Sequence, residues 1–319
     1  MTKIQINRRS FLKSAAAFAS VSPLASFAAA KIASVPVRRS EELQSELISQ
    51  WNADTEAVSH RVYLKYLRDG KTRGFRVLED LEKAFEKVMR EVKETVVSGD
   101  TPAIWSVYNM GYIVKTRKAV FSVDLNHRLG TKFVPLLDFA LVTHNHGDHW
   151  RRDFFDAMTA QNKIVISNFL ESPAFNAIKG DNPKGVGTYS IKDVKIRTSL
   201  IDHGNTPKMI DFTMAFEVKS GDWTLYHTGD SGKGTEPKLG TVWGAPDLWL
   251  FFPGCGIDTP KAVKKVRAKR IVFGHLWELG HAAGHKGRLD ESLIRPRLAE
   301  AKKAGCKAVS LAVWGDRIT

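Results

Sequence analysis

The chain has 319 residues, of which 43% are hydrophobic, a formal net charge of +14 and a sequence pI of about 9.7. This length suits one large domain or two modest ones. The basic charge favours an anionic substrate or an anionic surface. No run of Lys and Arg with interleaved aromatic residues occurs in the sequence, so binding of nucleic acid is disfavoured.

The first 30 residues have the features of an export signal, although an amphipathic surface helix is the alternative. A charged start is followed by a small and apolar run that ends in alanines. Arg8 and Arg9, followed by an apolar pair and Lys13, resemble the twin-arginine signal of bacteria. We therefore expect export by the twin-arginine machinery to the periplasm or another extracytoplasmic place. Residues 1–30 carry four basic side chains and no acid, so their removal would leave a net charge of +10 and no membrane-spanning segment.

Helical patterns dominate the next part of the chain, after a linker at 31–40. Apolar residues recur at helical spacing over 41–51, 53–70 and 78–96, and Gly70 fits the end of the second helix. We assign 31–100 as a helical extension. We expect this extension to be part of the scaffold, and a lid or a dimer surface are the alternatives. The second alternative would make the protein a homo-oligomer.

From residue 101 the pattern changes to short apolar strands separated by Gly, Asn and Asp. Helices are expected at 151–158 and 290–305, although Pro296 disturbs the second unless it lies in the first turn or at a kink. Strands mixed with helices predict a layered α/β fold. The expected strands cover 104–116, 118–125, 138–143, 163–168, 194–201, 212–220, 223–229, 247–252, 270–274 and 308–315.

Seven candidate metal ligands follow the ends of four of these strands. Functional loops gather at strand ends in α/β sheets, so the side chains would share one rim if the strands run parallel or align by their ends. A single tetrahedral zinc ion has four ligands, so seven nitrogen and oxygen ligands are too many for one such site. They suit two metals roughly 3.5–4 Å apart, bridged by a carboxylate and a water. Gly147 is expected to let the first loop turn tightly. The candidates are His144, His146, Asp148, His149, His203, Asp230 and His275.

This pattern, which begins with His144-x-His146-x-Asp148-His149, resembles the metallo-β-lactamase superfamily of binuclear hydrolases over 101–319. The resemblance implies an α/β fold built as a four-layer αββα sandwich, and a metal-dependent hydrolase with two divalent ions, Zn²⁺ ahead of Mn²⁺ or Fe²⁺. It also implies the ligand sets. His144, His146 and His203 would hold one ion, Asp148, His149 and His275 the other, and Asp230 would bridge them. True β-lactamases usually have Cys where Asp230 stands, so hydrolysis of antibiotics is disfavoured.

The reaction expected from such a centre is attack by a metal-bridging hydroxide on an ester-type bond, with Asp148 and Asp230 as catalytic residues. The bond would be a phosphodiester, a lactone or a related ester. The basic charge favours a small-molecule or lipid-like substrate that is anionic. Two alternatives stay open, an extracytoplasmic nuclease and a non-catalytic metal-bearing binding protein.

Five further residues have more than one interpretation. His281 and His285 would share one face of a helix or lie in a loop, and either could bind substrate or donate a proton. His227 is expected to be structural. Cys255 and Cys306 would form a disulfide in an oxidising compartment or remain small buried thiols.

Overall fold

Two β-sheets lie face to face in the computed structural model, which describes residues 41–170, 187–282, 285 and 287–319. The predicted export signal and linker fall outside the described residues. The first sheet has the order β1 (Ala103–Tyr108), β2 (Gly111–Lys115), β3 (Val120–Val123), β4 (Phe139–Leu141), β5 (Ile164–Ile166). The second has the order β12 (Ala308–Leu311), β11 (Arg270–Phe273), β10 (Leu248–Phe251), β9 (Trp223–His227), β8 (Thr213–Ser220), β7 (Val194–Ile201), β6 (Thr188–Ile191).

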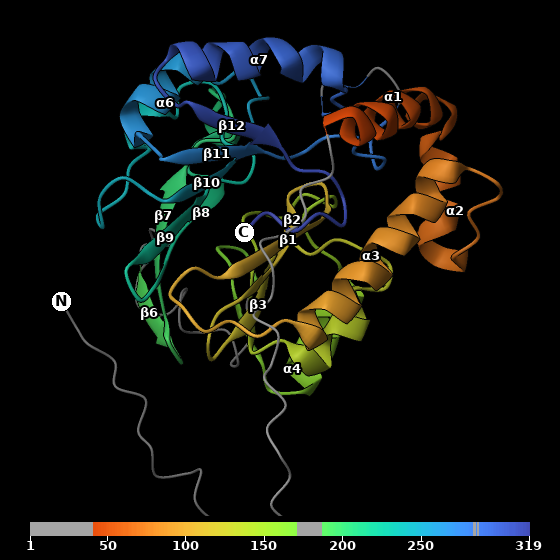
Figure 1. Cartoon of the computed structure of the whole chain (residues 1–319), viewed down its shortest axis with the longest axis horizontal. Helices are drawn as coiled ribbons and strands as arrows, with labels where there is room; N and C mark the ends of the chain where they lie inside the picture. Colours follow the sequence, from red (N-terminus) through yellow and green to blue (C-terminus); the bar gives the residue numbers. More distant parts are fainter. Residues whose placement is uncertain (1–40, 171–186, 283–284, 286) are drawn as a thin grey trace, which may run out of the picture. The chain divides into compact units, whose positions relative to one another are not determined.

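Helices cover the outer face of each sheet (Figure 1). α3 and α4 lie beside the first sheet, and α6 and α7 lie over the second. The described α-helices are α1 (Glu41–Ala57), α2 (His60–Asp69), α3 (Arg76–Glu94), α4 (Arg152–Ala160), α6 (Thr259–Val266) and α7 (Glu291–Lys303). The short 3₁₀ helices are η2 (Gly130–Leu136), η3 (Pro207–Met209) and η4 (Glu236–Lys238). The predicted four-layer αββα sandwich is therefore confirmed.

Strand residues alternate between two buried layers, which explains the continuous apolar runs in the sequence. In β10, Leu248 and Leu250 belong to the apolar cluster between the sheets, whereas Trp249 and Phe251 belong to the cluster under the helices. Successive side chains of a strand point to opposite faces. A strand covered on both faces is therefore apolar at most positions.

The directions of the strands bring distant loops to one edge. β8 runs antiparallel to both β7 and β9, and β9, β10, β11 and β12 are parallel neighbours. Consequently β7, β9, β10 and β11 all end at the same edge of the second sheet. In the first sheet β3, β4 and β5 are likewise parallel.

The helical extension packs into the same core as the sheets. Trp51 of α1 is 2% exposed and stacks on Trp314, with ring centroids 4.5 Å apart. It also meets the edge of Trp277, a buried residue that follows β11, at 5.1 Å. The Trp277 indole N–H donates to Asn52 of α1. The extension is thus tied to the loop after β11.

Local details differ from the sequence predictions at two helices. The helix predicted over 53–70 is broken, because the Ser59 side chain accepts from the Val62 N–H and begins α2 at His60. Gly70 ends α2 in the left-handed conformation with φ +67°, as predicted. Pro296 lies inside α7 rather than in its first turn. Among the described residues no helix combines the length and the apolar character needed to cross a membrane.

Candidate metal centre

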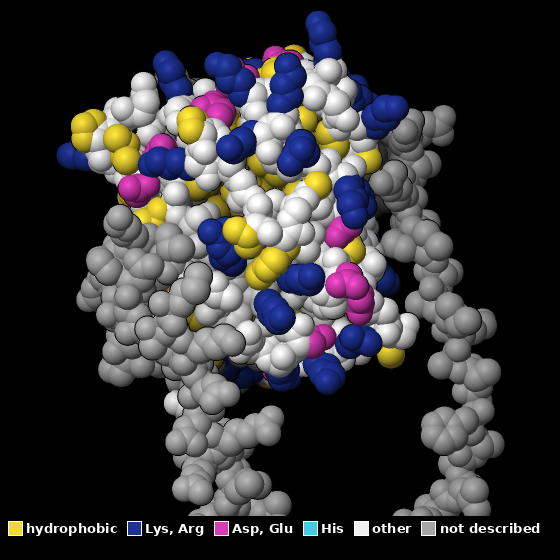
Figure 2. Space-filling view, turned by 90° about the vertical axis from the view of Figure 1, so that its left-hand side faces the viewer, with side chains coloured by type: hydrophobic (Ala, Val, Ile, Leu, Met, Phe, Trp, Pro, Cys, Tyr) yellow, Lys and Arg dark blue, Asp and Glu magenta, His cyan; other side chains and the backbone are white. Residues whose placement is uncertain are grey.

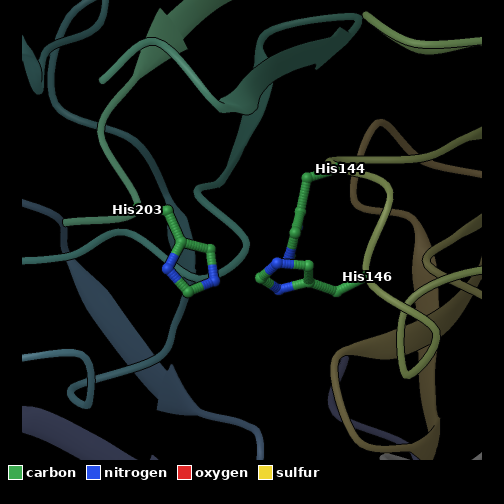
Figure 3. Close-up of side chains that lie close together, drawn as sticks. All are labelled: His144, His146 and His203. Carbon is green, nitrogen blue, oxygen red and sulfur yellow. The ribbon is translucent and has the colours of Figure 1, made fainter. Parts of the chain in front are cut away.

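All seven predicted ligands meet at the edge where the strands end. They form two groups, and within each group the candidate ligand atoms lie within 4.8 Å of one another. The first group is His144, His146 and His203, whose imidazoles point toward one another (Figure 3). The second group is Asp148, His149, Asp230 and His275. His203, Asp230 and His275 follow β7, β9 and β11, and the other four lie in the loop between β4 and α4.

Asp230 belongs to the second group and also lies beside a histidine of the first. Its Oδ1 lies 3.2 Å from His149 Nε2, and its Oδ2 lies 3.3 Å from His275 Nε2, both in the second group. The same Oδ2 lies 3.6 Å from His203 Nε2 of the first group. Ligand atoms about 2.0–2.1 Å from one tetrahedral ion are roughly 3.3–3.4 Å apart. The spacings fit one carboxylate that contacts two ions.

The donor chemistry of the site also fits metal ions. His144 Nε2 is buried and has no hydrogen-bond partner among the described residues, an arrangement that is costly unless a ligand fills it. Burial lowers the pKa of His144, and it lowers the pKa of His146 to about 4, so both rings are neutral donors near pH 7. Burial also lowers the pKa of His275, but the carboxylates of Asp230 and Asp148 outweigh it and raise the pKa to about 10. An ion binding there would release that proton.

Asp124, which sequence analysis did not single out, fixes the orientation of two of the histidines. Its carboxylate accepts from the Thr143 N–H at 2.7 Å, the Thr143 hydroxyl at 2.7 Å and His149 Nδ1 at 2.9 Å. Because the Thr143 hydroxyl donates to Asp124, its oxygen accepts from His144 Nδ1 at 2.9 Å. Both rings therefore carry a proton on Nδ1 and present Nε2 to the centre.

The two groups differ in their exposure. Every member of the second group is buried, whereas His146 and His203 of the first group are half-buried. Phe212, just before β8, packs against the three imidazoles of the first group with ring centroids 5.0–5.8 Å away. The centre is therefore least buried on the side of His146 and His203, beside the apolar ring of Phe212, which sequence analysis did not identify.

The structure also places three residues outside the ligand set. His227 is buried, with its Nε2 3.3 Å from the Met110 carbonyl and its Nδ1 accepting from the Gly229 N–H, so it is structural as predicted. Cys255 and Cys306 are both free, and the disulfide alternative was wrong. Cys255 lies with His203 and Asp230 in a further group of candidate ligand atoms within 4.8 Å. Burial raises the pKa of its thiol.

Comparison with known proteins supports the observed fold. No protein-family model matches the chain. A UPF0173 metal-dependent hydrolase from Pelotomaculum thermopropionicum is 26% identical over 153 residues, which are 43% of this chain and 66% of that protein, just under two thirds of its length. A possible metal-dependent hydrolase from Veillonella parvula is 14% identical, with a TM-score of 0.51 over 69% of this chain and 100% of that one. A metallo hydrolase from Ignicoccus hospitalis is 15% identical, with a TM-score of 0.50 over 68% and 97%.

The chain has the metallo-β-lactamase fold. Its two facing sheets, with helices outside each, place the loops of both sheets at one edge. The donor set at that edge suits divalent metal ions, and the similar proteins from Pelotomaculum thermopropionicum and Veillonella parvula are described as a metal-dependent hydrolase and a possible one.

Asp124→Asn is expected to weaken metal binding about 10–100-fold, because one amide oxygen cannot accept from the three donors that orient His144 and His149. Competition with a chelator measures this affinity. Asp138→Asn is the control, since Asp138 accepts from the Val120 N–H just before β4 begins, whereas the ligand loop follows the end of β4. Equal affinities for both variants would contradict the role of Asp124.

Gly232→Ala is expected to release metal, because an added Cβ would lie 1.9 Å from the backbone oxygen of His203 and must displace that loop. Gly147→Ala is the matched control in the other ligand loop. A Cβ there meets nothing within 4 Å, and Gly147 does not adopt a positive φ, so the predicted need for a glycine at that turn was wrong. Metal content per chain distinguishes the two variants, and similar losses in both would count against this account.

Proposed function

We propose that the chain is an exported binuclear metal-dependent hydrolase that cleaves an ester-type bond. The carboxylate of Asp230 supports this most directly, because its two oxygens face both groups of candidate ligands. Two divalent ions bound there would lower the pKa of a water to about 7 and would polarise the bond under attack.

The protein side chains would position the reactants. Asp230, between the two groups, would orient the attacking water. Asp148 is held by Asn109, whose side-chain amide donates to the Asp148 carbonyl at 3.0 Å and to its carboxylate at 3.2 Å. The apolar ring of Phe212 would limit water on the side where substrate enters. Such a reaction requires no serine or cysteine nucleophile.

The positive net charge of the chain favours an anionic substrate, such as a phosphodiester or a lipid-like ester. Figure 2 shows Lys and Arg side chains spread over one face, with acidic and apolar side chains between them. Such a surface raises the local concentration of small anions. On this face the basic residues do not form one continuous stripe. The sequence has no run of Lys and Arg with interleaved aromatic residues, so we propose a hydrolase of small anionic esters ahead of a nuclease.

Export through the twin-arginine machinery to the periplasm is part of the proposal. It rests on the sequence of residues 1–30. This route carries folded proteins, so it suits a chain that must acquire metal before it crosses the membrane.

The function is tested with purified, metal-loaded protein and a panel of bis(p-nitrophenyl) phosphate, simple esters and lactones. We expect hydrolysis of the phosphodiester, with metal-dependent turnover. Activity on esters or lactones alone would move the assignment to an esterase or lactonase. Bound metal without turnover of any substrate would favour a non-catalytic binding protein. Tight, salt-sensitive binding of DNA or RNA would favour the nuclease.

A further inference from the structure

Glu278 and His281 form a hydrogen-bonded pair directly beside the metal centre. The Glu278 carboxylate is buried, and its Oε2 lies 2.7 Å from His281 Nδ1 and 2.8 Å from the His281 N–H. Oxygens of Glu278 and Asp148 and a ring nitrogen of His281 all lie within 4.8 Å of one another. The pair therefore borders the second group of ligands without belonging to it.

Two further donors surround the buried carboxylate of Glu278. The Tyr108 hydroxyl lies 3.3 Å from Oε1, and the Gly280 N–H also donates to that oxygen. A buried carboxylate accepts only, so the ring nitrogen that faces it must carry a proton. The hydrogen bond to Glu278 and the charge of that carboxylate raise the pKa of His281.

The ring of His281 is fixed in place and yet accessible. His281 and His285 lie outside the described helices and strands, so the loop alternative is confirmed for both. Their rings stack with centroids 4.2 Å apart and an interplanar angle of 4°. Arg288 donates to the His281 carbonyl at 3.2 Å and to the Val58 carbonyl at 2.9 Å, which ties this loop to the helical extension. The His281 side chain is 33% exposed.

We propose that His281, oriented by Glu278, is the proton donor to the leaving oxygen of the substrate. The Nδ1–H of His281 stays hydrogen-bonded to Glu278. Its Nε2 gives a proton to the leaving oxygen as the bond from carbon or phosphorus to that oxygen breaks. The attacking water loses one proton to solvent, and the imidazole regains one from solvent, so the net reaction is ester plus water to acid plus alcohol. His281 is thereby a catalytic residue and Glu278 a positioning residue. This inference rests on the proposed function.

Leaving groups of different basicity provide the test. Two substrates share one acyl or phosphoryl group and differ in the leaving oxygen, which is either p-nitrophenolate or an alkoxide. p-Nitrophenolate leaves without a proton, whereas an alkoxide needs one. His281→Gln keeps a donor for Glu278 and is expected to lower kcat on the alkyl substrate about 10²–10⁴-fold. It should leave kcat on the p-nitrophenyl substrate within about 3-fold of wild type, with unchanged metal content.

Two controls separate the possible outcomes. His60→Gln, on the exposed side of α2, should change neither rate. Equal losses of His281→Gln on both substrates would overturn the proton-donor role alone, since they indicate a structural effect. Metal-loaded wild-type protein that hydrolyses neither substrate would overturn the proposed function, and the donor role with it.

Discussion

Asp230→Asn is expected to lower turnover on the order of 10³-fold or more and to reduce bound metal by about one ion per chain. The two carboxylate oxygens of Asp230 face His149 and His203 separately, and an amide replaces one of these oxygens with a nitrogen that cannot bind a metal ion in its place. Steady-state kinetics and elemental analysis of the purified variant measure the two effects.

Asp222→Asn is the matched control for Asp230→Asn. Asp222 lies in the turn between β8 and β9, and its side chain is 99% exposed. Its replacement should leave both turnover and metal content unchanged. Turnover in Asp230→Asn equal to that of the control would contradict the binuclear hydrolase.

Trp51→Ala is expected to destabilise the fold by about 3–5 kcal/mol, because it empties a buried site between Trp314 and Trp277. Loss of its N–H bond to Asp80, 3.0 Å long, adds to the cost. A thermal melt should show a Tm lowered by roughly 10 °C.

Leu64→Ala is the comparison for Trp51→Ala, since Leu64 of α2 is 51% exposed and its loss should cost no more than about 0.5 kcal/mol. Similar melting temperatures for both variants would show that the helical extension does not share the core. In that case the contacts of Trp51 could not support the loop that carries His275 and His281.

The ligand set could be predicted from the sequence because each ligand follows an apolar strand directly. His203, Asp230 and His275 come two or three residues after such a strand, and the strands that precede them run in the same direction. The local pattern fixes where the strand ends, and the sheet then gathers those ends at one edge.

Asp124 was missed because its role depends on which strands are neighbours. It follows β3, and Thr143 and His144 follow the parallel neighbour β4. Strand adjacency depends on packing between distant segments, which local periodicity does not reveal. The position of Glu278 beside Asp148, 130 residues away in sequence, has the same cause.

Two described elements were missed for different reasons. α6 has only eight residues, too few for a clear helical period, although Asp258 caps it and Pro260 stands in its first turn. β6 is a four-residue edge strand that alternates between exposed and half-buried positions, so it lacks the apolar character of the inner strands.

The number of metal ions bound to each chain tests the central claim most directly. Protein purified and reconstituted with Zn²⁺, then dialysed, is analysed for metal by inductively coupled plasma mass spectrometry. The two groups of ligands joined by Asp230 predict about two ions per chain. One ion or fewer per correctly folded chain would contradict a binuclear centre.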